Sequence, residues 1–292
     1  MSGRFFEGTV ALYGFGRMGR HHARHLEALA RRVVVIDPAL GMMPEHGTID
    51  AVVVATPTRT HAEVARPWLT RGVPTLVEKP LSTIPAEAAA LAAFPCLSVG
   101  HIERYNPAFR VVQEGGSIRG SGVVVPAADT RFLQADRLAT WSNRSFDADV
   151  VFDMMIHDLD LFVVLTGGEE VVDVRANGVS VTTSALDIAH ARVETRSGRV
   201  GLFAASRISR RPLRSLRVFE AGAYWSVDLG KKTALRVASD LVDADVNVGA
   251  EDALESELRA FLGAVISGAA APVPGSEALA SITLAERIRC AC

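Results

Sequence analysis

Short apolar runs alternate with helix-like segments over the first hundred residues. The runs are rich in β-branched residues and apolar on both faces, which is typical of strands in a parallel sheet that helices cover on each side. Helical spacing indicates helices at Arg17–Ala30, His61–Gly72 and Pro85–Phe94. We therefore predict a Rossmann-type, doubly wound α/β domain. Its strands are expected at Thr9–Gly16, Arg32–Asp37, Ala51–Thr56, Pro74–Lys79 and Cys96–Gly100.

The pattern changes after Asn106 and Pro107, which suit the cap and first turn of a helix. A long apolar helix is expected over Val150–Gly168, and Ala253–Ile266 reads as an amphipathic helix that closes the chain. Consecutive strand-like runs between them favour an α+β domain with an open, mainly antiparallel sheet. The runs are Glu170–Val181, Leu186–Thr195, Arg199–Arg207, Ser215–Leu229 and Thr233–Ser239.

A chain of 292 residues is long for one domain. We predict an N-terminal domain over residues 1–105 and a substrate-binding and oligomerisation domain over residues 106–292.

The net charge, the apolar runs and the cysteine content exclude several classes of partner and location. A net charge of −2 gives no electrostatic reason to expect nucleic acid or an anionic membrane. No apolar run approaches the roughly 18 residues that a membrane span needs, and no apolar signal segment precedes the first strand. Cys96, Cys290 and Cys292 form neither a metal pattern nor a disulfide framework, which fits a reducing compartment. We expect a cytoplasmic protein.

The stretch GFGRMG has the spacing G-x-G-x-x-G, directly after a strand and at the start of a helix. In that context Gly14 permits a tight turn, Gly16 lets the backbone approach a pyrophosphate, and Gly19 lets the helix pack on the sheet. The helix N-terminus favours the phosphate charge. The predicted cofactor loop consists of Gly14, Phe15, Gly16, Arg17, Met18 and Gly19.

Asp37 ends the second strand, 18 residues after Gly19, where a carboxylate would bind the adenosine ribose hydroxyls. No Arg or Lys follows in DPALGMM, so a 2′-phosphate would meet repulsion. We expect NAD as the cofactor in preference to NADP.

His21 and His25 lie four residues apart and could share a zinc ion. No nearby carboxylate or cysteine completes the set, so we interpret the histidines of this helix as solvent-exposed and predict no metal.

Lys79 ends a strand in the motif VEKP. Ligands of open α/β sheets bind at the carboxyl ends of the strands, so this lysine should point into the cofactor crevice. There it could donate a hydrogen bond to a substrate hydroxyl and stabilise the alkoxide as hydride leaves, with a pKa lowered by desolvation. The alternative is an exposed lysine at a strand end.

Five motifs occur in the order seen in the Gfo/Idh/MocA (glucose–fructose oxidoreductase/inositol dehydrogenase) family, which the chain resembles over nearly its whole length. GHIERYNPA and DMMIHDLD look most like the branch that oxidises UDP-N-acetylglucosamine at C3. The motifs are GFGRMGRHH, ATPTRTH, VEKP, GHIERYNPAF and DMMIHDLD.

The resemblance implies a Rossmann domain that binds NAD(P), a second domain whose open sheet builds oligomers, and a cyclic sugar or polyol substrate. We expect a homodimer or homotetramer. The family's catalytic lysine falls on Lys79, and its Asp-x-x-x-His pair falls on Asp153 and His157.

Further residues carry over from the same motifs. Arg104 and Asn106 are candidates for substrate contact, and Arg104 could instead be a structural tie. The residues implied near the cofactor are Thr56, Pro57, His61 and, beside the nicotinamide, Glu78.

One departure from the family concerns the connection after the second strand. Only residues 38–49 separate Asp37 from Asp50, which leaves little room for the usual helix and strand. We predict a sheet trimmed after its second strand, a more open adenine pocket and an uncertain affinity for the cofactor.

The predicted enzyme is a dehydrogenase that transfers hydride between a ring hydroxyl and nicotinamide. His157 would take the hydroxyl proton, Lys79 would position the hydroxyl, and Asp153 would orient the substrate or tune the histidine. Which of Lys79 and His157 accepts the proton stays open. In a helix, Asp153, His157 and Asp160 share one face, whereas Asp158 points elsewhere and could be a tie.

Alternatives remain for the function. The substrate is expected to be a nucleotide sugar such as UDP-N-acetylglucosamine, but a free sugar, an inositol or another cyclic alcohol would need the same residues. A non-catalytic NAD-binding sensor would have no reason to keep Lys79, Asp153 and His157 together.

Overall fold

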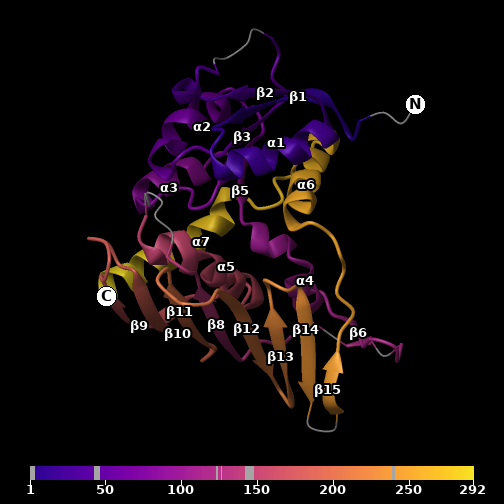
Figure 1. Ribbon diagram of the computed structural model, residues 1–292, viewed down its shortest axis with the longest axis vertical. Coiled ribbons are helices and arrows are strands. Elements are labelled where there is room, and N and C mark those ends of the chain that lie inside the picture. The colour runs from indigo at the N-terminus through magenta and orange to yellow at the C-terminus, as the bar shows by residue number, and fades with distance from the viewer. Residues whose placement is uncertain (1–3, 43–46, 123, 126, 142–147, 239–240) are drawn as a thin grey trace. The chain divides into compact units, whose positions relative to one another are not determined.

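The computed structural model describes residues 4–42, 47–122, 124–125, 127–141, 148–238 and 241–292 (Figure 1). These residues form two compact units. The first unit runs up to Ile102 and also contains Leu254–Ile282, and the second contains Glu103–Ala253 and Thr283–Cys292. Residues 254–282 thus pack with the first unit, although they lie far along the chain. The division at residue 105 into a cofactor-binding and a substrate-binding domain stays a prediction.

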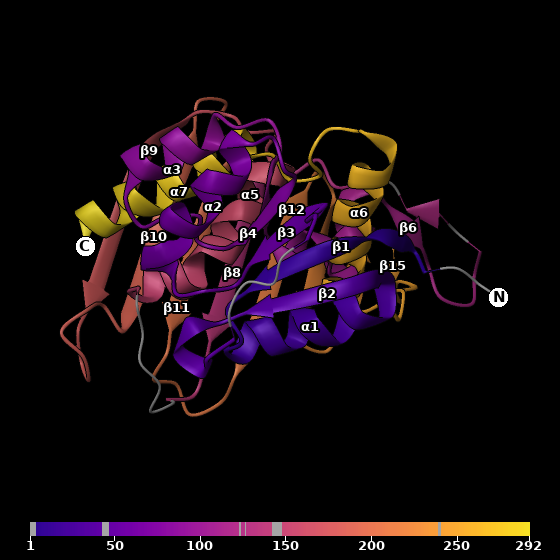
Figure 2. The ribbon, with the colours of Figure 1, turned by 90° about the horizontal axis from the view of Figure 1, so that it is seen from above.

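The first unit is built on a five-stranded parallel sheet in the order β2-β1-β3-β4-β5. Figure 2 shows β2, β1, β3 and β4 side by side in this order. The inner strands β3 and β4 and the edge strand β5 are buried along their whole length, as expected of a sheet covered on both faces. The strands are β1 (Phe6–Tyr13), β2 (Ala30–Ile36), β3 (Ala51–Val54), β4 (Thr75–Glu78) and β5 (Leu97–Gly100).

Helices α1 (Arg17–Leu29), α2 (His61–Thr70), α3 (Pro85–Ala92) and α6 (Ala253–Ser267) belong to this unit. One core cluster contains apolar side chains of β1, α1 and α6. Burial of this apolar area attaches α6 to the first unit. The side chains that α6 contributes are Leu254, Leu258, Phe261 and Leu262.

The connection after β2 confirms the predicted trimming of the sheet. A single 3-10 turn, Pro38–Leu40, follows Asp37, and Met42 forms a lone bridge with Asp37. The next strand is β3, which pairs with β1 on its other side. Among the described residues, β2 is therefore an edge strand of the parallel sheet.

The second unit contains an eight-stranded sheet in the order β15-β14-β13-β12-β8-β11-β10-β9, visible across Figure 1. All neighbours are antiparallel except β8 and β11, which confirms a mainly antiparallel sheet. The strands are β8 (Phe132–Leu138), β9 (Val171–Val179), β10 (Ile188–Thr195), β11 (Val200–Ser206), β12 (Leu213–Glu220), β13 (Ala223–Asp228), β14 (Thr233–Ala238) and β15 (Leu241–Asp245).

A helical segment packs on this sheet against β8 and β11. It begins with a π-helical turn, η4 (Val151–Met155), and continues as α5 (Ile156–Leu165). Gly167 and Gly168 follow with positive φ, which confirms the predicted glycine stop. A shorter helix, α4 (Pro107–Gln113), and a small hairpin of β6 (Gly116–Ser117) and β7 (Val124–Val125) complete this part.

Several elements were not predicted. Strands β6, β7 and β15 were missed, and the single run predicted over Ser215–Leu229 forms two strands, β12 and β13. Strand β8 and helix α7 were missed as well. The central strand β8 was missed because its buried face carries Leu133, Ala135 and then Arg137, a charge where the pattern requires an apolar residue. Helix α7 (Gly275–Ala291) follows α6, so the prediction that Ala253–Ile266 closes the chain was wrong. Pro and Gly before α7 mask a helix whose buried positions include Ala278, Ile282 and Ile288.

Among the described residues, no helix has both the length and the apolar character that a membrane span requires.

Candidate active site

The glycine loop after β1 has the geometry that its sequence predicts. Gly14 has a φ of +90°, and a Cβ atom there would lie 2.6 Å from the carbonyl oxygen of Ala55. A Cβ at Gly19 would collide with the Gly14 carbonyl oxygen, so Gly19 allows the helix to pack on the loop. Gly16 faces open space instead, which leaves room for a ligand to approach the backbone.

Asp37 ties this loop to the end of β2. One carboxylate oxygen accepts a hydrogen bond from the Phe15 N–H at 2.8 Å, and the other accepts one from the Ala39 N–H at 3.1 Å. The first turn of α1 contains no acidic residue, and the helix has Gly16 at its N-cap. Backbone N–H groups and the helix dipole therefore favour an anion here. These features fit a dinucleotide.

The other predicted loop residues differ in exposure. Arg17 is exposed, and Met18 and Phe15 are half-buried. The Arg20 guanidinium lies 5.2 Å from the Phe15 ring centroid and donates a hydrogen bond to the Phe15 carbonyl oxygen. Arg20 thus braces the loop from the exposed side of α1.

His61 joins the loops that follow β3 and β4. Its Nε2 lies 2.9 Å from the Thr56 carbonyl oxygen, and its Nδ1 lies 3.0 Å from the Pro80 carbonyl oxygen. The ring is buried, whereas Pro57 is exposed. His61 therefore links the segment after β3, which contains Thr56, to the segment after β4, which contains Lys79.

Glu78, at the end of β4, is buried and pairs with His22 of α1. His22 Nε2 lies 2.7 Å from Glu78 Oε1, and the Lys79 N–H donates to Glu78 Oε2 at 3.2 Å. Burial by itself raises the pKa of Glu78, but the hydrogen bond from His22 and the charges of His22, Lys79 and His61 outweigh it and lower that pKa. The half-buried Lys79 thus follows an ionised carboxylate.

The interpretation of the α1 histidines as solvent-exposed was wrong for His22, which is fully buried. His21 is exposed and His25 is half-buried. The error arose because the partner of His22, Glu78, is distant in sequence. Among the described residues, no three metal-ligating side chains gather into a metal site.

In the second unit, Asp153 lies in the wide η4 turn and His157 in the first turn of α5. Both side chains are half-buried. The Asp149 carboxylate caps the segment by accepting hydrogen bonds from the Val151 and Phe152 N–H groups at 2.9 and 3.1 Å. This cap holds the turn that carries Asp153 in place.

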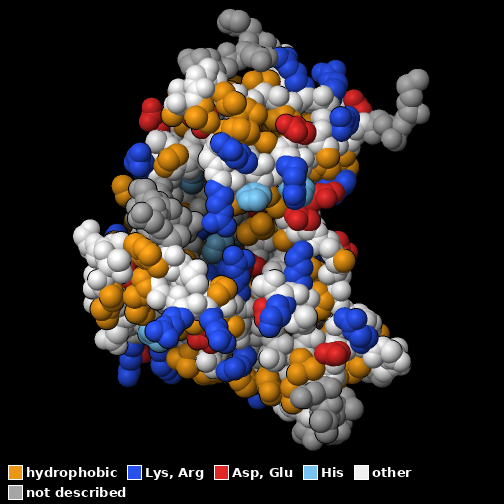
Figure 3. Space-filling view, in the orientation of Figure 1, with side chains coloured by type: hydrophobic (Ala, Val, Ile, Leu, Met, Phe, Trp, Pro, Cys, Tyr) orange, Lys and Arg blue, Asp and Glu red, His pale blue; other side chains and the backbone are white. Residues whose placement is uncertain are grey.

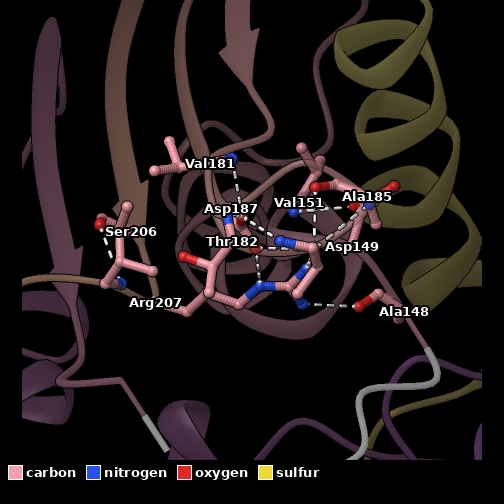
Figure 4. Close-up of polar contacts among 11 residues, drawn as sticks. Ala148, Asp149, Val151, Val181, Thr182, Ala185, Asp187, Ser206 and Arg207 are labelled. Atoms are coloured by element: carbon pink, nitrogen blue, oxygen red, sulfur yellow. Dashed lines mark hydrogen bonds and ion pairs between the residues drawn. The ribbon is translucent and has the colours of Figure 1, made fainter.

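A buried ion pair supports the same turn from the sheet (Figure 4). The Arg207 guanidinium donates to Asp187 at 2.8 Å and to the Ala148 carbonyl oxygen at 3.1 Å, just before the cap. Asp187 also accepts the N–H groups of Val181, Thr182 and Thr183. Burial opposes ionisation of Asp187, but these donors keep its pKa well below the usual range.

Arg104 and Asp160 form a two-pronged ion pair. Arg104 Nε and Nη2 lie 2.7 and 2.8 Å from the two carboxylate oxygens of Asp160, which is 1% exposed. Of the two predicted roles for Arg104, these contacts favour the structural tie. The segment before α4 is thereby fastened to the middle of α5.

Asp158 confirms its predicted role as a tie, and its partner is Arg137 of β8. Arg137 donates to Asp158 at 2.7 Å and to Glu103 at 2.8 Å, and all three side chains are buried. The two carboxylates keep the pKa of Arg137 raised despite its burial. Burial raises the pKa of Asp158 in spite of the arginine, whereas the charge of Arg137 outweighs burial and lowers that of Glu103.

Asn106 is buried and serves as the N-cap of α4. Its side-chain oxygen Oδ1 accepts a hydrogen bond from the Ala108 N–H at 3.1 Å. Its side-chain nitrogen Nδ2 donates to Glu103 and to the Leu229 carbonyl oxygen, both at 2.9 Å. These contacts favour a structural role, and the predicted substrate contact stays untested.

The structure therefore places the predicted residues in two groups, one within each unit. The first unit contains the glycine loop, Asp37, Thr56, His61, Glu78 and Lys79. The second contains Asp153 and His157, in a helical segment that buried ion pairs anchor. Sequence reasoning missed Arg137, Asp187 and Arg207, because a buried arginine resembles an exposed one until its partners are known.

Two family models match the chain. The model described as "Oxidoreductase family, NAD-binding Rossmann fold" matches residues 37–94, and the GFO/IDH/MocA C-terminal domain model matches residues 125–222.

Relatives cover most of the chain. UDP-N-acetylglucosamine 3-dehydrogenase of Acidithiobacillus ferrooxidans is 34% identical, and the similarity covers 88% of each chain. A solved structure of that enzyme, GnnA, superposes with a TM-score of 0.84 at 33% identity and covers 98% of both chains. Inositol 2-dehydrogenase of Rhizobium meliloti is 25% identical over 94% of each chain. From these similarities and the two matching domains, the chain belongs to the Gfo/Idh/MocA family of oxidoreductases.

Proposed function

We propose that the protein is an NAD-dependent dehydrogenase that oxidises a ring hydroxyl of a nucleotide sugar, such as the C3 hydroxyl of UDP-N-acetylglucosamine. The observation that carries this proposal is the 34% identity to UDP-N-acetylglucosamine 3-dehydrogenase over 88% of both chains. Lys79, Asp153 and His157 supply the polar groups that such a reaction needs. A dehydrogenase of a free sugar or an inositol is the second candidate, supported by the weaker similarity to inositol 2-dehydrogenase.

The glycine loop Gly14–Gly19 and Asp37 would hold the cofactor, whose nicotinamide accepts hydride when bound. The open N-terminus of α1 suits the pyrophosphate, and the Asp37 carboxylate suits ribose hydroxyls. A 2′-phosphate would be repelled by the same carboxylate, so NAD is favoured over NADP. The short connection after Asp37 would leave the adenine pocket open and weaken the affinity.

In the proposed mechanism, His157 takes the proton of the substrate hydroxyl as general base. Lys79 donates a hydrogen bond to the same oxygen and stabilises its negative charge as hydride leaves. Asp153 orients the sugar ring from the preceding turn. The cap at Asp149 and the ion pairs at Asp158, Asp160 and Asp187 keep these groups in place.

An arginine-rich segment favours an anionic substrate over a neutral inositol. Ser209–Arg217, before and within β12, contains four exposed arginines. Figure 3 shows Lys and Arg side chains on the surface over the strands of the second unit. A diphosphate would find charge-assisted hydrogen bonds there, whereas an inositol would find no charge to pair with them. The arginines are Arg210, Arg211, Arg214 and Arg217.

Self-association and location are further parts of the proposal. The face of the large sheet formed by β8, β9, β10 and β11 has a cavity of about 420 Å³. None of the predicted site residues lines it. We propose this open face for assembly into a homodimer or homotetramer, in the cytoplasm.

The experiment is absorbance at 340 nm with NAD and a panel of UDP-sugars, free hexoses and inositols. We expect reduction of NAD with UDP-N-acetylglucosamine, and losses in kcat of about 10²–10⁴-fold for Lys79→Ala and His157→Ala. Lys231→Ala, at a residue 81% exposed, is the matched control. A flat trace with every substrate, together with NAD binding measured by calorimetry, would favour the sensor. A rate with inositol alone would favour the second candidate.

A further inference from the structure

The loop between β11 and β12 crosses the end of β8. In the sheet order β12-β8-β11, β8 lies between two strands that are consecutive in the chain. The loop, residues 207–212, is fastened to the segment that follows β8. The Ala139 N–H donates to the Ser206 carbonyl oxygen at 2.7 Å, and the Ser209 N–H donates to the Ala139 carbonyl oxygen at 2.9 Å. Trp141, two residues further along, therefore leaves the sheet at the end that this loop crosses.

The helical segment with Asp153 and His157 begins at the same end of the sheet. Arg207, the first residue of the crossing loop, donates to the Ala148 carbonyl oxygen at 3.1 Å, and the next residue, Asp149, caps the segment (Figure 4). Hydrogen bonds thus join the crossing loop, the start of the helical segment and the chain after β8 within the second unit. A substrate bound at the helical segment would lie at this end of the sheet.

The crossing loop carries two arginines into solvent. Arg210 and Arg211 are exposed, and neither forms an ion pair with any residue that the structure describes. The exposed Arg110 and Arg196 of the same unit differ, because they pair with Glu114 and Glu170. Adjacent cations repel one another, so an anion bound between Arg210 and Arg211 would remove an unfavourable interaction.

A third arginine, Arg214, is anchored to the start of α5. Its Nη1 lies 3.5 Å from Glu103 Oε1, which accepts a hydrogen bond from Arg137 at 2.8 Å. Arg137 in turn donates to Asp158, the residue after His157, at 2.7 Å. The Arg214 side chain is 54% exposed, and a guanidinium group has five N–H donors, so donors remain for a ligand.

Trp141 adds a flat apolar surface to this cationic end. Its side chain is 40% exposed, whereas Trp225 is fully buried and Trp68 is half-buried. An indole ring offers a face on which a nucleobase stacks, and guanidinium groups bind phosphate oxygens. A ring and neighbouring guanidinium groups match the two parts of a nucleoside diphosphate.

We propose that Trp141 and three arginines form a subsite for the nucleoside diphosphate part of the substrate. The base stacks on the indole, and the phosphates accept hydrogen bonds from the arginines. No bond forms or breaks there, so the subsite contributes affinity and specificity. The inference rests on the proposed function, which makes the substrate a nucleotide sugar. The arginines are Arg210, Arg211 and Arg214.

The experiment is calorimetry with UDP and with inorganic pyrophosphate, in the presence of NADH to occupy the proposed cofactor site. We expect Trp141→Ala to raise the Kd of UDP by about 5- to 150-fold and to leave that of pyrophosphate unchanged. Arg210→Gln and Arg214→Gln should each raise both Kd values by about tenfold or more. Arg110→Gln, at an arginine 49% exposed, is the matched control and keeps the wild-type values.

Turnover of UDP-N-acetylglucosamine gives a second measurement. Trp141→Ala should raise KM and leave kcat unchanged, as expected of a residue that binds the substrate and the transition state equally. A merely structural role of Trp141 would lower kcat as well and would weaken pyrophosphate along with UDP.

Equal affinity for UDP in the wild type and the three variants overturns the inference, and reduction of NAD by the same proteins leaves the proposed function intact. UDP binding that depends on Trp141 and the arginines, without reduction of NAD by any substrate, supports the subsite and overturns the proposed function. If Trp141→Ala does not fold, Trp141→Phe decides. The chain contains three tryptophans. UDP should quench the tryptophan fluorescence of the wild type but not of Trp141→Phe, and equal quenching in both contradicts the inference.

Discussion

Among the described residues, each buried acid of the second unit meets an arginine. Of the buried acids of the first unit, Glu78 pairs with His22, whereas neither carboxylate oxygen of Glu257, in α6, has a hydrogen-bond partner. Both carboxylate oxygens of each acid in the second unit accept hydrogen bonds, from the arginine alone at Asp158 and Asp160 and from additional donors at Glu103 and Asp187. In the first unit His22 satisfies Glu78, whereas burial and the charge of Glu78 raise the pKa of Glu257 well above its usual range. The pairs of the second unit are Glu103 and Asp158 with Arg137, Asp160 with Arg104, and Asp187 with Arg207.

The difference separates two uses of buried charge. A saturated ion pair fixes geometry, because any movement of either partner exposes an unpaired charge to an apolar environment. An unsaturated acid fixes little, but its proton responds to nearby charge. By this reasoning, the buried charges of the second unit hold the segment with Asp153 and His157 in place, whereas the first unit contains a buried group, Glu257, whose proton depends on pH.

The largest effect is expected from Arg137→Met, which leaves Glu103 and Asp158 buried without a cation. We expect a loss of about 3–5 kcal/mol in the free energy of unfolding, measured by urea denaturation. Arg214→Met is the control, because Arg214 is 54% exposed and lies 3.5 Å from the same Glu103. Its loss should be about 0–1 kcal/mol. Equal losses in the two variants would contradict the saturated network.

A smaller effect is expected from His22→Leu, which removes the donor to Glu78. The free energy of unfolding should fall by about 1–3 kcal/mol, since a buried acceptor loses its partner. His21→Leu, at the exposed neighbouring position of α1, should change it by less than about 0.5 kcal/mol. The same urea titration measures both. A His22 variant as stable as the His21 variant would show that Glu78 does not depend on this contact.

The smallest effect is expected from Glu257→Gln in the absence of cofactor, and it depends on pH. The unfolded chain loses this proton near pH 4, whereas the folded protein holds it to a higher pH. The wild-type free energy of unfolding therefore falls as pH rises through that window, and the Gln variant does not share the fall. The variant should gain stability from pH 5 to pH 8, within about 1 kcal/mol. Melting curves of both proteins at pH 5 and pH 8 measure this difference in stability. If the stability of the variant relative to the wild type fell from pH 5 to pH 8, the pKa of Glu257 would be lowered and not raised in the folded protein.

Much of the fold follows from local patterns in the sequence. The parallel strands are apolar on both faces, and the short connection after Asp37 is visible in the residue count alone. Strand β8 is different, because Arg137 occupies an inward position and its two partners lie in other segments. Helix α7 was hidden by the proline and glycine before it. The spacing of apolar residues predicts the helices and strands that bury them. It fails where a buried charge, a proline or a glycine interrupts the regular spacing.

The residues of the candidate site were likewise predicted only in part. The glycine loop was found from sequence because each glycine has a local steric reason, which the geometry at Gly14 and Gly19 confirms. The resemblance to the family placed Lys79, Asp153 and His157, whose roles stay predictions. Glu257 and His22 gave no signal, since a helix position is buried or exposed according to what packs on it. Long-range pairing is the information that a single sequence lacks.

Val151–Met155 forms a wide, π-helical turn. The position of Asp153 therefore depends on the number of residues in this turn as well as on their identity. A π turn contains one residue more than an α turn, as an insertion into a helix would produce. Deleting that residue would rotate Asp153 by about 100° around the helix axis relative to His157. Asp158 and Asp160 would keep their arginines, because they lie beyond the turn. Insertions and deletions here would therefore move Asp153 relative to His157 while the anchored part of the helix stays constant.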